Sequence, residues 1–175
     1  MAASKSLLAR LTGGDRRSIG QADEIAALVL KQPALIGELM TGLRDLDPLV
    51  RMRAADAAEK ASLKQPALLR PFREELLRLL DEASQQEVRW HLAQMLPRLP
   101  LTQKQRLRAA LSLRRYMEDS SSIVKTCALQ ALAEIAAEDA SLQLQVKALL
   151  QTAIKTGTAA MKARSRKLLR QFEDR

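Results

Sequence analysis

The sequence predicts an all-α protein, an α-solenoid built from stacked antiparallel helix pairs. A pair formed by an apolar and then a basic residue recurs four times, 36 to 38 residues apart: Val50-Arg51, Val88-Arg89, Val124-Lys125 and Met161-Lys162. The segment LKQPAL occurs at 30–35 and again at 63–68. A fixed period of this length is typical of stacked repeats. Ala and Leu supply most of the apolar residues and favour helix, whereas aromatics are only 2% of the chain, so we expect almost no β-strand.

The length of 175 residues suits one domain. We divide it into an N-terminal cap over 1–32 and four repeats over 33–65, 66–99, 100–138 and 139–172. Each repeat holds a first and a second helix. The predicted first helices cover 33–44, 66–80, 102–117 and 140–155, and the second helices cover 48–62, 86–98, 121–137 and 158–172. Pro33 and Pro66 suit the first turn of a helix, and Asp47 and the run 119–122 suit N-caps of second helices.

Each second helix carries an apolar face that starts at the motif residue and continues four, seven and eight positions later, which is helical spacing. The residues at these later positions are Ala54, Ala57 and Ala58; Leu92, Met95 and Leu96; Ala128, Ala131 and Leu132; and Ser165, Leu168 and Leu169. The small side chains let neighbouring helix backbones approach closely. No single helix pair can bury both of its apolar faces, so we expect the pairs to stack.

The first 32 residues resemble an incomplete repeat. Residues 20–31 have the pattern of a second helix, 4–11 have that of a degenerate first helix, and Gly13-Gly14 separates them. The start of the chain is basic and contains Ser, as in a transit peptide, but a short capping helix is the interpretation we prefer.

The net charge of +9 is concentrated in the C-terminal half. Residues 98–117 and 155–172 each contain six Lys or Arg and no acidic residue, so the rest of the chain carries −3. Such an asymmetry indicates an anionic partner or a solvated basic surface. If the two stretches converge, they should form a continuous positive surface.

Cysteine content and hydropathy favour a cytoplasmic protein. The single cysteine, Cys127, excludes an internal disulfide framework and suits a reducing compartment. The longest apolar run is only six residues, 25–30, which is far short of a membrane span. We therefore expect no membrane association.

The second helices resemble those of HEAT and HEAT-like repeat proteins. The resemblance covers about residues 18–172 and is carried by the segment from Asp45 to Arg51, followed by Ala54-Ala55 and Ala57-Ala58. It implies a right-handed superhelix with second helices on its concave side. It also implies a ladder of acidic and basic residues between repeats, with Asp45 near Arg51 or Arg89, and Asp119 near Lys125 or Lys162. Ala83 and Thr156 stand at the acidic position of the other two repeats.

If second helices line the concave side, the residues two, three and six positions after each motif residue should point into it. We take this stripe as the candidate binding face, with a solvated helix face as the alternative. Its members are Met52, Arg53 and Asp56; Trp90, His91 and Gln94; Thr126, Cys127 and Gln130; and Ala163, Arg164 and Lys167, with Arg170 further along the last helix. Trp90 is the only Trp, a residue type enriched in interface hot spots.

The sequence indicates no catalytic, cofactor or metal site. His91 and Cys127 occupy equivalent positions in adjacent repeats, but neighbouring helices lie about 8–10 Å apart, too far for two short side chains to form a nucleophilic pair. One His and one Cys without a ligand-type spacing do not indicate a metal site.

The leading hypothesis is a non-catalytic scaffold that binds another protein, for example through an acidic segment. The alternative is binding of a nucleic-acid backbone by the basic C-terminal half, since some HEAT-like proteins grip duplex DNA and excise alkylated bases. A third possibility is a chromophore-lyase-like enzyme, which the resemblance allows and no residue singles out.

Overall fold

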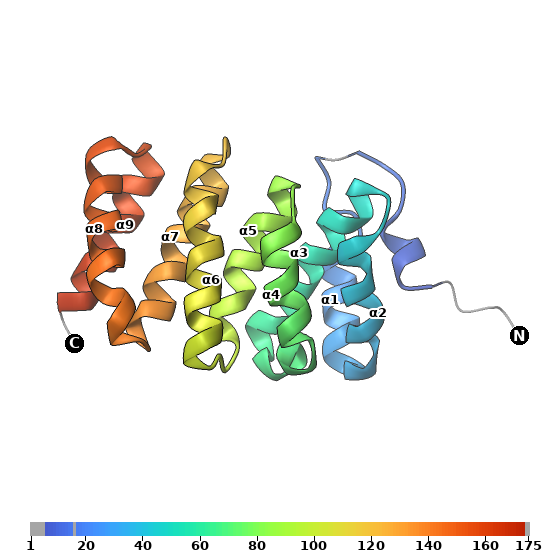
Figure 1. Cartoon of the computed structure of the whole chain (residues 1–175). Coiled ribbons are helices and arrows are strands. Elements are labelled where there is room, and N and C mark those ends of the chain that lie inside the picture. Colours follow the sequence, from blue (N-terminus) through green and yellow to red (C-terminus); the bar gives the residue numbers. More distant parts are fainter. Residues whose placement is uncertain (1–5, 16, 174–175) are drawn as a thin grey trace, which may run out of the picture. The chain divides into compact units, whose positions relative to one another are not determined.

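The computed structural model describes residues 6–15 and 17–173, and this part of the chain is all-helical (Figure 1). It contains nine α-helices and six short 3-10 helices and no β-strand. The chain forms two compact units, Met1–Arg73 and Glu74–Arg175. The boundary falls inside the predicted repeat 66–99. Residues 1–5, which include part of the predicted helix 4–11 and of the transit-like start, lie outside the described part.

The N-terminal unit contains α1 (Ala22–Lys31), α2 (Ile36–Thr41) and α3 (Pro48–Lys64), with 3-10 helices at Leu8–Leu11, Pro33–Leu35, Gly42–Arg44 and Pro66–Phe72. Helix α3 packs against α1 and α2. As predicted, the Asp47 side chain caps α3 by accepting a hydrogen bond from the Leu49 N–H at 2.8 Å, and Pro48 occupies the first turn. The Asp47 cap and the proline together favour a helix that begins at Pro48.

Gly42 shows why small residues are needed in this unit. A Cβ atom at this position would lie 2.8 Å from the Ala54 Cβ and 2.7 Å from the Leu8 side chain. The backbone of the 3-10 helix Gly42–Arg44 approaches α3 so closely that no side chain larger than hydrogen fits at Gly42. Close approach through alanine and glycine is the packing that the second-helix pattern predicts.

The C-terminal unit contains α4 (Arg73–Glu82), α5 (Gln86–Met95), α6 (Gln103–Arg115), α7 (Ser122–Ala137), α8 (Ala140–Thr156) and α9 (Ala159–Glu173), with short 3-10 turns after α5 and α6. Helix α7 is central and packs against α5, α6, α8 and α9. Within this unit α4, α6 and α8 form one layer, and α5, α7 and α9 form the other (Figure 1).

The four motif residues occupy equivalent buried positions, as predicted. Val50, Val88, Val124 and Met161 are each the third residue of a helix, in α3, α5, α7 and α9, and each is at most 6% exposed. The apolar faces that follow them are also buried, apart from the half-buried Leu169. Residues separated by the period of 36 to 38 residues therefore occupy the same position in four different helices.

In two repeats the basic member of the motif donates to a backbone carbonyl of its own repeat. The Arg51 guanidinium donates to the Asp45 carbonyl at 2.7 Å, and that of Arg89 donates to the Ala83 carbonyl at 2.7 Å. Both acceptors lie six residues upstream. The replacement of an acid by Ala83 thus leaves this contact intact, because the acceptor is the peptide group.

Acidic residues link successive repeats of the C-terminal unit. Asp119 forms its ion pair with Arg89 of the preceding repeat, at 2.5 Å, which was not predicted. The predicted Lys125 is close enough to act electrostatically on the Asp119 carboxylate. A second link, not foreseen from the sequence, joins Arg106 to Asp139 at 3.2 Å. Both acids also accept hydrogen bonds from backbone N–H groups at the start of the next helix, from Ser121 and Ser141. Asp139 is the N-cap of α8, whereas Asp119 holds the turn that leads to Ser121, the N-cap of α7. Each carboxylate also anchors the repeat before it.

The pairing of Asp119 predicts a pH effect on stability. Burial alone would raise the pKa of Asp119, but the hydrogen bonds from the Ser121 N–H and from Arg89 outweigh it and hold the pKa below its usual 3.8. Because the pKa is lower in the folded chain, ionised Asp119 stabilises the fold above the unfolded value, and this contribution disappears as pH falls through the folded pKa. We expect Asp119→Asn to reduce the free energy of unfolding near neutral pH, and the difference from wild type to shrink below about pH 4.

Urea unfolding at a series of pH values measures this difference. A difference that stays constant from about pH 7 down to about pH 3 would mean that the carboxylate charge contributes nothing.

Candidate functional site

In the N-terminal unit, the predicted binding stripe is only partly available. Met52 and Asp56 are half-buried. The Lys60 ammonium group pairs with Asp56 at 2.7 Å and with Asp23 at 2.5 Å. Arg53 is 2% exposed, so the expectation that it lies on an open binding face is wrong. Its guanidinium is enclosed by the loop that precedes α1.

Four backbone carbonyls hold Arg53. The guanidinium donates to Leu11 at 2.8 Å, Gly13 at 2.6 Å, Asp15 at 3.2 Å and Ser18 at 3.1 Å. The loop can wrap this closely because Gly20 has φ +56° and its Cα lies against the guanidinium, where a Cβ would come within 2.9 Å of Arg53 Cζ. Arg53 is therefore a structural anchor for the N-terminal loop.

In the C-terminal unit, the stripe residues of α5 are divided between the surface and the interior. Trp90 is half-buried and meets the His91 ring edge-on, with 5.7 Å between ring centroids. His91 is 8% exposed, so it belongs to the helix packing and not to an open face as predicted. Gln94 remains half-exposed and its amide contacts the Cys127 sulfur of α7 at 3.5 Å.

Side-chain contacts join the rest of the stripe across α7 and α9. The Arg164 guanidinium donates to the Gln130 side-chain oxygen at 2.7 Å, and the Gln130 amide nitrogen donates to Glu134. Thr126 is half-buried and bonds to its own helix at the Ser122 carbonyl. Lys167 and Arg170 are exposed on α9. The structure thus brings together a polar face on α5, α7 and α9, which we call the α5–α7–α9 face, with Gln94, Gln130 and Arg164 along it.

The two basic stretches differ in how far acids compensate them. Acids of neighbouring elements pair with three of the five α6 cations: Arg108 with Asp81 at 2.9 Å, Arg115 with Asp81 at 2.8 Å, and Arg106 with Asp139. In contrast, none of the α9 cations forms an ion pair within residues 6–15 and 17–173. Among the described residues, α9 therefore carries a larger uncompensated positive charge than α6, where Lys104 and Arg114 form no ion pair.

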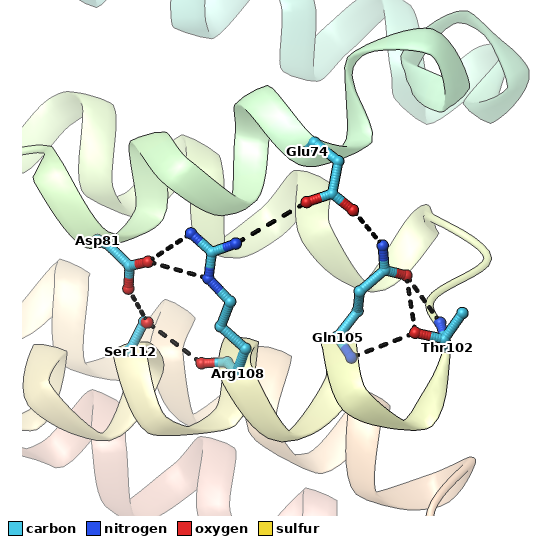
Figure 2. A network of polar contacts seen from close by, with 6 residues as sticks. All are labelled: Glu74, Asp81, Thr102, Gln105, Arg108 and Ser112. Carbon is cyan, nitrogen blue, oxygen red and sulfur yellow. Dashed lines mark hydrogen bonds and ion pairs between the residues drawn. The ribbon is translucent and has the colours of Figure 1, made fainter.

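Figure 2 shows the network between α4 and α6 that compensates the first stretch. Burial alone would raise the pKa of Asp81, but the Ser112 hydroxyl and the guanidinium groups of Arg108 and Arg115 outweigh it and lower the pKa. Glu74 accepts from Gln105 and lies 3.8 Å from Arg108 (Figure 2). Gln105 also completes the capping box of α6 with Thr102. The network therefore stabilises the contact between α4 and α6. The absence of acidic residues within 98–117 gave no indication of it, because the acids come from α4.

A second surface feature is an apolar groove between α6 and α8, with a volume of about 570 Å³. Leu107, Leu111 and Arg114 line it from α6, and Leu142, Gln145 and Val146 line it from α8. No binding site between these two helices was predicted from the sequence. The available signal was the spacing of Leu107 and Leu111, four residues apart on a helix whose inward face is formed by other residues.

Within the described residues, no group of three or more His, Cys, Asp or Glu side chains is arranged to hold a metal ion. No helix there combines the length and apolar character needed to cross a bilayer. Comparison with protein-family models, with curated proteins and with solved structures found no match to this chain.

Proposed function

We propose that this chain is a non-catalytic interaction module that binds an acidic segment of another protein through the α5–α7–α9 face. The observation that carries the proposal is the set of exposed cations on α9 without an ion pair in the described residues, next to half-exposed polar side chains of α5 and α7. An exposed positive surface attracts acidic partners and accelerates their association.

The architecture we infer for the C-terminal unit is a HEAT-like solenoid, in which each helix pair stacks on the next and second helices form the concave side. Three features of the C-terminal unit support this inference: the equivalent buried positions of the motif residues, the links Arg89–Asp119 and Arg106–Asp139 between successive repeats, and the central packing of α7. In such a stack the α5–α7–α9 face is the side that usually engages partners.

Binding of a nucleic-acid backbone is the second candidate function, and the same α9 cations favour it. Lys and Arg side chains neutralise phosphates without reading sequence, so a cationic helix is sufficient for non-specific contact. Of the two aromatic residues in the predicted stripe, His91 is buried and Trp90 is half-buried, so we do not extend the proposal to base excision.

Replacing Arg164, Lys167 and Arg170 by Ser tests both candidates. We expect weaker binding of polyglutamate in the protein case or of random-sequence duplex DNA in the nucleic-acid case, with little change in stability because the three side chains are exposed. The measurement is fluorescence anisotropy at several salt concentrations. For DNA, three lost phosphate contacts should lower the salt slope by about three units. For an acidic protein segment, the loss should mainly slow association.

The matched control replaces Lys31, Lys64 and Arg70 by Ser, which removes the same charge from exposed positions of the N-terminal unit. This variant should bind as wild type does. If both triple variants lose equal affinity, net charge alone drives binding and the α5–α7–α9 face has no special role. If wild type binds neither probe at low salt, the α9 cations form a solvated surface and the proposal is wrong.

A further inference from the structure

The groove between α6 and α8 exposes apolar side chains to solvent. Its floor consists of buried side chains, among them Leu132 of α7, Leu142 and Val146. Above the floor, Leu107 is 40% and Leu111 is 62% exposed. The two leucines are four residues apart and so lie on one side of α6. Concave apolar surfaces and exposed apolar patches are typical of binding sites.

The two helices that flank the groove carry charge of one sign. Neither α6 nor α8 contains Asp or Glu. Arg114 lies in the groove and donates to Gln145 across it at 3.3 Å, and exposed Lys104 lies one helical turn before Leu107. Neither cation forms an ion pair within the described part of the chain. Arg108 and Arg115 are compensated on the opposite flank by Asp81, which leaves Lys104 and Arg114 for an external acid.

We propose that this groove docks an amphipathic helix of a partner protein, with the apolar stripe of the helix on Leu107 and Leu111 and its acidic residues against Lys104 and Arg114. Recognition of an amphipathic helix by a groove between two helices uses apolar anchors spaced i, i+3, i+4 and i+7. The acidic character of the partner follows from the basic rim.

A second copy of this chain is a poorer occupant. A two-fold dimer through this groove would place the same surface opposite itself, and so would oppose the basic rims of the two copies. The inference goes beyond the proposed function, because α6 and α8 form the layer opposite the α5–α7–α9 face within the C-terminal unit (Figure 1).

Three designed peptides test the groove. Each has about 18 residues, enough for roughly five helical turns, and carries Leu at i, i+3, i+4 and i+7. They differ only in the polar positions, which are Glu, Gln or Lys. With the full chain, we expect the Glu peptide to bind about tenfold more tightly than the Gln peptide at low salt, and the Lys peptide to bind most weakly.

Exposed side chains provide the variants and their controls. Leu111→Ser should weaken binding of the Glu peptide about tenfold, as truncation of an interface anchor does. Leu144→Ser removes an equally apolar side chain that is 81% exposed on α8 outside the groove lining, and should change nothing. Arg114→Gln should reduce the preference for Glu over Gln, whereas Lys155→Gln, an exposed α8 cation outside the groove, should not. In the background of the Arg164, Lys167 and Arg170 variant, which removes the cations of the α5–α7–α9 face, Leu111→Ser should still weaken binding of the Glu peptide about tenfold.

Several results would overturn the proposal. Equal affinity for the three peptides would show that the rim does not select an acidic partner. Equal losses in Leu111→Ser and Leu144→Ser would place the peptide elsewhere. Disappearance of the Leu111→Ser effect in the α9 variant would assign the peptide to the α5–α7–α9 face. If no peptide binds and sedimentation detects a dimer that Leu111→Ser dissociates, the occupant is a second copy of this chain. If no peptide binds and the protein is a monomer, the groove has no docking role.

Discussion

Replacing Leu132 by Asp is expected to unfold the C-terminal unit. Leu132 is 1% exposed and lies on α7, the helix that packs against α5, α6, α8 and α9. The substitution removes a buried leucine, which costs about 2–5 kcal/mol, and buries a carboxylate without a partner, which costs several kcal/mol more. The sum is comparable to the whole stability of a domain, about 5–15 kcal/mol. Far-UV circular dichroism and thermal melting measure the loss of helix.

Leu144→Asp is the matched control, because it introduces the same charge at a leucine that is 81% exposed. Its stability should stay within about 0.5 kcal/mol of wild type. Ala54→Asp makes the equivalent test in the N-terminal unit, where Ala54 is fully buried on α3. Melting curves of Leu132→Asp and Ala54→Asp that match wild type would show that these residues are not in packed interfaces.

The helices themselves could be predicted from the sequence because their signals are local. The predicted second helix 48–62 is observed as Pro48–Lys64, and the predicted first helix 140–155 as Ala140–Thr156. A side-chain cap, a proline in the first turn and an apolar stripe all lie within one helix length of each other. The motif residue marks the same place in four helices because it follows the cap at a fixed distance.

Charge compensation could not be predicted from charge counts along the chain, since the partners lie about one repeat apart. Asp81 is 27 residues from Arg108, and Asp139 is 33 residues from Arg106. The stretch 98–117 is free of acid in sequence but receives acids from α4 and from the start of α8. The offset of one repeat is nevertheless a usable signal, because a residue in a stacked helix pair meets its neighbours one period away.

Arg53 and His91 show the other limit of the prediction. Both stand three positions after a motif residue, where helical geometry alone points side chains away from the core. A loop or an aromatic neighbour can cover that position, and helix periodicity carries no information about what lies above it. In the N-terminal unit the relevant signal was the set of glycines at 13, 14 and 20, all of which have positive φ and allow the loop to close over Arg53.

Replacing Arg53 by Met is expected to release the loop that precedes α1. Met keeps most of the side-chain volume but leaves four backbone carbonyls without their donor, and hydrogen bonds to a charged group contribute about 1.5–3 kcal/mol each without being additive. We expect a loss of at least about 3 kcal/mol in the N-terminal unit. Thermal melting gives the total loss, and limited proteolysis within residues 11–20 should become faster before global unfolding.

Arg164→Met provides the control, because Arg164 stands at the equivalent third position after its motif residue but is exposed on α9. Its effect on stability should stay within about 0.5 kcal/mol. Gly20→Ala should reproduce part of the Arg53→Met effect, since a methyl group there adds strain at φ +56° and collides with the guanidinium. If Arg53→Met and Arg164→Met melt alike and proteolysis of the loop is unchanged, the loop is held by its own packing, and Arg53 only fills the space beneath it.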